Sequence, residues 1–227
     1  MILAAVLIAV LASALALLAP GCGNSKSASE PSSTQSPAPS AGMARYTNDT
    51  RGFSFDYESD LDCMSDSNAM LHGQSTILGQ TGAFTVEVLN PKDESAELRR
   101  GFLVMSEHLT GLPYKTLTDA NAEFMLAYIK REMLAGAKSR SSSFTLVSGP
   151  EVTSHNGAPA LDLAYTEVEA GQKMRLELRI LLKNDYLYTA MLVAPDASFG
   201  QDTQRFQTCL DSFRAFELPP RAPTQGT

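Results

Sequence analysis

The sequence has no tryptophan and only three cysteines and three histidines among its 227 residues. It contains no Gly-x-Ser-x-Gly nucleophile elbow, no phosphate-binding glycine loop with Lys-Ser/Thr and no dinucleotide fingerprint. The common sequence signatures of hydrolases, NTPases and dinucleotide enzymes are therefore missing. Basic residues are also few, since 18 Lys and Arg stand against 25 Asp and Glu, for a net charge of −7. This balance argues against nucleic acid as a partner, because that affinity comes mainly from cations that neutralise phosphates.

Metal ligands are equally sparse. His72, His108 and His155 are expected at the surface, in a loop, at a helix end and in a turn, and none stands at zinc spacing from another ligand. One acidic cluster offers hard oxygens for Ca²⁺, but it lacks the glycine and the distal glutamate of a calcium loop. We expect a solvated acidic loop and no cofactor; the weak metal candidates are Asp56, Glu58, Asp60, Asp62 and Asp66.

The start of the chain is strongly apolar. Residues 2–19 are only Ala, Leu, Val, Ile and one Ser, and Cys22 follows, before a polar segment rich in Ser and Pro. This order is typical of a secretory signal that ends at a lipid-attachment site. Leu18-Ala19-Pro20-Gly21-Cys22 resembles the bacterial lipobox, although Pro20 is unusual there and no Lys or Arg precedes the run. The resemblance implies a signal peptide over residues 1–21 and lipid on Cys22. The alternative is an uncleaved membrane anchor, and either would place the domain on the extracytoplasmic side of the cell membrane.

The remaining chain divides by composition. Asn24 to Gly42 has no large apolar side chain and cannot build a core. We predict a disordered Ser/Pro-rich tether over residues 22–43, one folded domain over 44–218 and a disordered tail over 219–227. With lipid on Cys22, Cys63 and Cys209 remain as an even pair in an oxidising compartment, which favours a disulfide. The alternative is that both are small buried apolar residues.

Periodicity predicts mostly strands. Two helices interrupt them, one with Leu98, Phe102, Met105 and Leu109 on a stripe, the other from Thr118 or Asp119 to Gly136. A last helix is predicted over Gln201–Arg214, and His155-Asn156-Gly157 reads as a hairpin turn. This order predicts an α+β fold, a central antiparallel sheet flanked by helices on both faces. The predicted strands are Arg45–Thr47, Phe53–Tyr57, Ala83–Leu89, Phe144–Thr153, Pro159–Val168, Gln172–Lys183 and Tyr186–Ala194.

Three segments carry a family resemblance. Residues 46–57 are similar to the opening hairpin of the PsbP and DcrB family, whose α/β/α sandwich is shared with Mog proteins. The meander through Tyr165, Arg175 and Tyr186-Leu187-Tyr188 is similar to its central sheet, and residues 206–213 to its closing helix. The chain departs from the family at Ser59-Asp60-Leu61-Asp62-Cys63, where members commonly have a Pro and then a Trp. The resemblance implies a PsbP-like bacterial lipoprotein with a non-catalytic role.

The expected function is therefore a membrane-anchored binding or assembly module, not an enzyme, that recognises an envelope protein. Arg175, Glu177 and Arg179 are expected to form cross-strand pairs or to rim such an interaction surface. One alternative is a carrier or sensor of a small apolar ligand, lined by adaptable methionines. The least favoured alternative is a hydrolase whose catalytic residues lie far apart in sequence. The methionines of the carrier alternative are Met105, Met125, Met133 and Met174.

Overall fold

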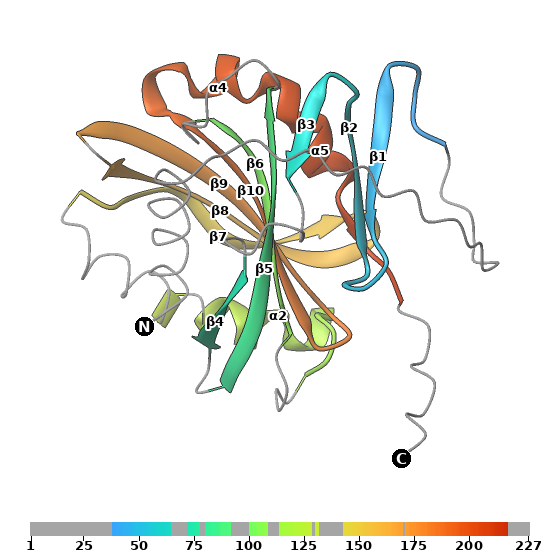
Figure 1. Ribbon diagram of the computed structural model, residues 1–227. Helices are drawn as coiled ribbons and strands as arrows, with labels where there is room; N and C mark the ends of the chain where they lie inside the picture. Colours follow the sequence, from blue (N-terminus) through green and yellow to red (C-terminus); the bar gives the residue numbers. More distant parts are fainter. Residues whose placement is uncertain are drawn as a thin grey trace.

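The computed structural model describes residues 38–64, 72–77, 80–91, 100–108, 114–128, 130–131, 143–169 and 171–217. The signal peptide, Cys22, most of the tether, Asp66, Met133 and the tail from residue 218 lie outside these ranges. Two antiparallel sheets dominate the described chain (Figure 1). The smaller sheet has the order β1-β2-β11, with β1 at Met43–Asn48, β2 at Phe53–Glu58 and β11 at Arg214–Ala215.

The larger sheet has eight strands in the order β3-β5-β6-β10-β9-β8-β7, and β4 also pairs with β5. The last four strands of the chain's meander follow one another through tight turns and are neighbours, as alternating sequence predicted. Strand β7 is one edge of the sheet. The bounds are β3 Leu61–Met64, β4 His72–Ile77, β5 Gln80–Pro91, β6 Gly101–His108, β7 Thr145–His155, β8 Ala158–Glu169, β9 Gln172–Lys183 and β10 Tyr186–Pro195.

The helices are short. α2 (Asp119–Tyr128) starts as predicted, and the side chain of Asn121, its third residue, accepts from the Thr118 N–H at 2.8 Å, which caps the first turn. The predicted closing helix is broken into α4 (Phe199–Asp202), a 3₁₀ turn at Gln204–Phe206 and α5 (Gln207–Ser212). α4 and α5 lie towards one end of the large sheet and α2 towards the other (Figure 1). Among the described residues, none of the helices has the length and apolar character needed to cross a membrane.

The first predicted helix is wrong in its described part, where the structure has strand β6. Every residue from Gly101 to Glu107 is buried, so this strand has core on both faces. A doubly covered strand is apolar throughout and loses the alternation that reveals a half-buried one. The spacing of Phe102 and Met105, three residues apart, matched a helical stripe by coincidence, and in the strand these two side chains face opposite ways.

One layer of the core lies between the two sheets. Phe53 and Phe55 of β2 meet Phe102 of β6 and Tyr188 of β10, and Phe213 closes the cluster from the end of α5. Each of these rings is at most 1% exposed, and their centroids lie 5.0–5.8 Å apart in the contacts of Phe53 with Tyr188 and of Phe55 with Phe102. The predicted antiparallel sheet is confirmed. The layer over this face, however, is the three-stranded sheet together with the C-terminal helices, so the described fold is mostly sheet.

Candidate functional site

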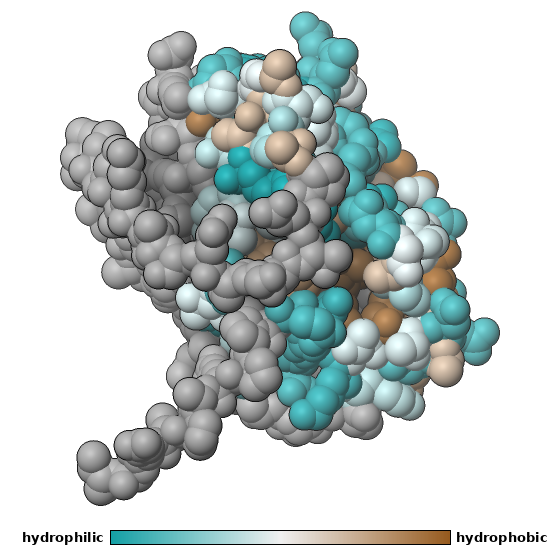
Figure 2. All heavy atoms as spheres, turned by 90° about the vertical axis from the view of Figure 1, so that its right-hand side faces the viewer, coloured by the Kyte–Doolittle hydropathy of each residue, from teal (hydrophilic) through white to brown (hydrophobic). Residues whose placement is uncertain are grey.

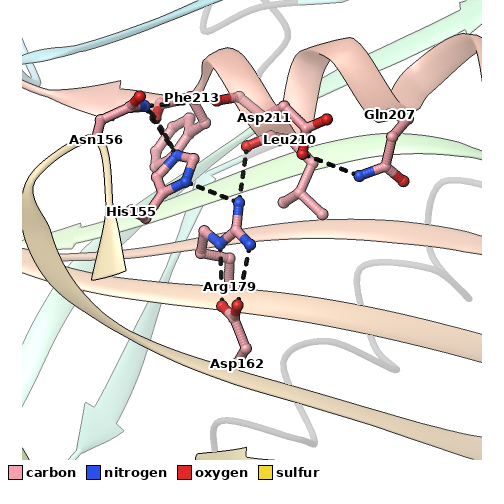
Figure 3. Close-up of polar contacts among 8 residues, drawn as sticks. All are labelled: His155, Asn156, Asp162, Arg179, Gln207, Leu210, Asp211 and Phe213. Atoms are coloured by element: carbon pink, nitrogen blue, oxygen red, sulfur yellow. Dashed lines mark hydrogen bonds and ion pairs between the residues drawn. The ribbon is translucent and has the colours of Figure 1, made fainter. Parts of the chain in front are cut away.

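A polar network joins the large sheet to the C-terminal segment (Figure 3). His155 ends strand β7, and Asn156 and Gly157 turn the chain into β8 with φ of 51° and 78°, the left-handed values of a type I′ turn. This turn directs both His155 and Asn156 towards the end of α5 (Figure 3). His155 is only 8% exposed, so the prediction of a surface histidine is wrong.

The imidazole of His155 is held at both nitrogens. Its Nε2 lies 2.6 Å from the Phe213 carbonyl oxygen, and its Nδ1 lies 2.9 Å from Nη1 of Arg179. A guanidinium can only donate, so Nδ1 is the acceptor and the ring proton sits on Nε2, which donates to Phe213. The geometry therefore fixes a neutral ring in the Nε2–H tautomer.

Arg179 is the centre of this network. It lies on β9 directly opposite Asp162 of β8, and Nε and Nη2 reach the two carboxylate oxygens at 3.0 and 2.9 Å. This forked pair leaves Nη1 for His155 and for the Leu210 carbonyl oxygen at 3.3 Å. The prediction that Arg179 forms a cross-strand pair is confirmed. Arg175, in contrast, pairs with Glu177 on its own strand at 2.6 Å.

Asn156 completes the network. Its Nδ2 donates to the Phe213 carbonyl oxygen at 3.0 Å, beside the His155 donor. The carbonyls of Leu210 and Phe213 stand at the end of α5, where a helix has no partners of its own for its last carbonyl groups. We call this set the C-terminal latch: His155, Asn156, Asp162 and Arg179, with the carbonyls of Leu210 and Phe213.

The electrostatics of the latch favour the neutral histidine. Burial is the largest cause and lowers the pKa of His155, and the Arg179 charge lowers it further. The hydrogen bond to Phe213 and the charges of Asp162 and Asp211 raise that pKa, without reversing the direction. In a catalytic triad the carboxylate orients the histidine, whereas here Asp162 binds Arg179 and the guanidinium faces the ring. This arrangement suits a fastening between chain segments.

A second buried ionisable group lies on β6. Glu107 is 0% exposed, and burial raises its pKa to about 8. The sequence contained no signal for it, because the segment was predicted to be a helix whose apolar stripe left Glu107 on the polar side. On the strand, its cross-strand neighbour is the buried Leu187.

The acidic cluster is largely taken up by arginines. Asp56 accepts a forked pair from Arg45 on the neighbouring strand, at 2.6 and 2.9 Å. Glu58 and Asp60 share Arg205, at 2.8 and 2.6 Å. Within the described ranges, no group of three or more His, Cys, Asp or Glu is arranged to hold a metal ion. The structure thus places three of the five predicted carboxylates in ion pairs.

The other predicted site residues lie mostly in the core. Cys209 of α5 is 0% exposed and belongs to the cluster between the sheets. The backbone of Cys63 lies on β3, opposite Leu89 of β5. Met105, Met125 and Met174 are 1–4% exposed, as packed core residues are. The predicted disulfide remains a prediction.

Exposed apolar side chains lie on and beside the β7 edge of the large sheet, but not all on one face. Leu146 and Val152 lie opposite Tyr165 and Leu161 of β8 and share a face, whereas Val168, three residues after Tyr165, faces the other way. Among the described residues, the large hydrophobic side chains with the greatest exposure all belong to β7, β8, α2 and the residues just before α2, and α2 contacts both strands. Phe124 is 46% exposed and packs edge-on against Tyr114 with centroids 5.5 Å apart. On the face in Figure 2, hydrophobic residues appear only as small patches between hydrophilic ones. We call the following four residues the β7-edge surface: Tyr114, Phe124, Leu146 and Val152.

Known proteins offer similarity in fold only. No protein-family model and no curated protein matches the chain. Among solved structures, it is similar to cyanobacterial PsbP (CyanoP) of Synechocystis sp. PCC 6803, with 16% identity, 81% of this chain and 98% of that chain covered, and a TM-score of 0.49. It is also similar to PA94, a protein of unknown function from Pseudomonas aeruginosa, with 15% identity, 80% and 99% covered, and a TM-score of 0.43.

A third similar structure is LpqN of Mycobacterium tuberculosis, described as involved in cell envelope biogenesis. Its identity is 8%, the coverage is 77% of this chain and 91% of that chain, and the TM-score is 0.43. The PsbP-like resemblance predicted from the sequence is thus found again among solved structures. At these identities and scores, the roles of those proteins stay with them.

Proposed function

We propose that this chain is an exported, lipid-anchored module that acts by binding a protein partner in the bacterial envelope, without catalysis of its own. The β7-edge surface is the observation that supports partner binding. Its members include Phe124 at 46%, Val152 at 42% and Leu146 at 38% exposure, on the neighbouring elements α2 and β7. Clustered exposed apolar side chains are a feature of interaction surfaces, whereas scattered ones are ordinary.

The kind of partner follows from the chemistry of this surface. It combines the aromatic pair Tyr114 and Phe124 with aliphatic side chains of an edge strand. Aromatic anchors and apolar neighbours fit an apolar patch on another protein. With a net charge of −7, an anionic lipid surface is a poor match. Lipid on Cys22 would keep this surface near the membrane, and the predicted tether would set its reach.

The anchor is tested by Cys22→Ser in the full chain. We expect the variant to leave the membrane fraction of cells and to lose the acyl mass seen on the amino-terminal peptide of the wild type. Ser25→Ala, a change close to the anchor that leaves all three cysteines in place, is the control and should fractionate like the wild type. The lipid anchor would be overturned if the Cys22→Ser variant stayed in the membrane fraction and the amino-terminal peptide of the wild type carried no acyl group.

The surface is tested by Phe124→Ser combined with Val152→Thr, because Val152 is 42% exposed and threonine keeps its branched shape. We expect crosslinking in intact membranes to give a several-fold lower yield of protein adducts with this variant than with the wild type. Glu123→Ser, an exposed position on the same helix, is the matched control and should keep them. Melting temperatures within a few degrees would show that both variants are folded. Equal adduct yields in folded variants would refute binding at this surface.

A further inference from the structure

The segment that follows α5 is attached to the domain by few contacts. Strand β11 has only two residues, which pair with Ser54 and Phe53 of β2. Phe216 donates to the Gly52 carbonyl at 2.8 Å and accepts from Asn184 at 3.4 Å, and Glu217 lies 3.6 Å from Lys183. Immediately before β11, the Phe213 carbonyl accepts from both His155 and Asn156. The latch therefore adds two hydrogen bonds at the residue where this end of the chain leaves α5.

Protonation of His155 keeps the Nε2–H donor to Phe213 but changes the contact of the ring with Arg179 in two ways. Nδ1 can no longer accept from Arg179, because it then carries a hydrogen that points at the guanidinium. The ring also becomes a cation with another cation 2.9 Å away. We infer that the C-terminal latch is an acid-sensitive fastening, which holds Phe213 and β11 in place while His155 is neutral and loosens them when the ring gains a proton.

The charges around the ring support this inference. Arg179 comes from β9, Asp162 from β8 and Asp211 from α5. Both carboxylate oxygens of Asp162 accept hydrogen bonds from Arg179, and Asp211 accepts from Gln207 at 3.0 Å. Both carboxylates attract a protonated His155 through space, yet each is directed at another partner. Burial outweighs their attraction, so the pKa of His155 is lowered and the neutral ring is the form that fits.

Loosening would be local before it is global. The Phe213 ring is 0% exposed and packs on Phe53 at 5.8 Å between centroids, so the ring resists leaving the core. Strand β11 has no comparable burial, since both of its residues are partly exposed. We therefore expect β11 to open first, which uncovers the edge of β2 as a place where another strand can pair. This inference is independent of the proposed lipid anchor and partner.

The test is amide hydrogen exchange of the full chain between pH 8 and pH 5, corrected for the intrinsic pH dependence of exchange. The amides of β11 and Phe216 should lose protection as pH falls, by at most tenfold per pH unit for one proton. In His155→Gln, whose amide can still donate to Phe213 but does not titrate, this dependence should vanish. His108→Gln, the same change at a histidine stacked on Tyr186, should follow the wild type.

Two results would overturn the inference. One is a wild type whose β11 protection does not change with pH, and the other is a His155→Gln variant that keeps the dependence. If His155→Gln does not fold, NMR titration of the wild type decides. A Phe216 amide signal that changes with the midpoint of the His155 ring supports the latch, and a different midpoint refutes it.

Discussion

Gly149 offers a sharp test of the packing that supports the latch. It lies in β7 within the register shift between Ser148 and Glu151, and its φ is +67°. A Cβ at this position would overlap the carbonyl oxygen of Asp162. That oxygen belongs to the backbone of the residue that binds Arg179, so it cannot rotate away. Gly149→Ala should therefore strain β7 and displace the anchor of the latch.

A matched control separates the two contributions to this destabilisation, the left-handed backbone and the steric clash. Gly171 has φ +82°, and a Cβ there would meet nothing within 4 Å. Gly171→Ala should lower the free energy of unfolding only through the left-handed backbone, by about 1–2 kcal/mol. Gly149→Ala should have the same backbone effect and should also overpack the site, which typically destabilises by about another 1–3 kcal/mol. The free energy of unfolding should thus fall by about 2–5 kcal/mol in Gly149→Ala.

Urea unfolding followed by circular dichroism measures both variants. At an unchanged slope, the shift of the midpoint gives the change in unfolding free energy. We expect Gly149→Ala to unfold at clearly lower urea than Gly171→Ala. Two variants that agree within about 0.5 kcal/mol, the usual error of such comparisons, would refute the close approach of Gly149 to Asp162.

Three further predictions follow from buried polar groups. Arg179→Met and Asp162→Asn should each destabilise the protein, and a double-mutant cycle should give a coupling of about 1–3 kcal/mol because the pair is partly buried; additive effects would contradict the pairing. Because burial raises the pKa of Glu107 to about 8, its contribution to stability is complete below pH 4.5 and is lost as pH rises through 8. The wild type should therefore lose on the order of 5 kcal/mol of unfolding free energy over this range, and Glu107→Gln should abolish that loss in urea titrations. An unchanged pH profile would count against this. Non-reducing peptide mapping of exported protein should find Cys63 linked to Cys209, with a stabilisation of roughly 4–5 kcal/mol that reductant removes; two alkylatable thiols would reject the bridge.

Half-buried strands were readable from the sequence. Strand β9 has the predicted bounds, since its inward residues are buried and its outward ones are partly exposed over most of its length. Strand β2 differs from the prediction by one residue. In both strands apolar and polar residues alternate, and this period of two can be recognised directly in the sequence. The turn at Asn156 was also readable, because positive φ restricts the residue types that fit.

Elements with other surroundings could not be read in this way. Strand β6 has no polar face, and its apolar run matched a helical spacing as well as a strand. The closing helix was predicted to reach Arg214 but α5 stops at Ser212, where the chain extends into β11. This change depends on pairing with β2, more than 150 residues earlier in the chain. No local pattern near Arg214 encodes such a distant partner.

The latch shows both kinds of information in adjacent residues. Asn156 is needed by the turn for its positive φ, which is a local demand, and its amide also reaches Phe213, which is 57 residues away. His155 has no local reason to be buried; its environment is created when α5 and β9 come together around it. A turn signal therefore placed His155 at a loop in the sequence, while the tertiary structure closed that loop against the C-terminal segment. The local pattern locates such a residue, and only the assembled sheet decides what its side chain can do.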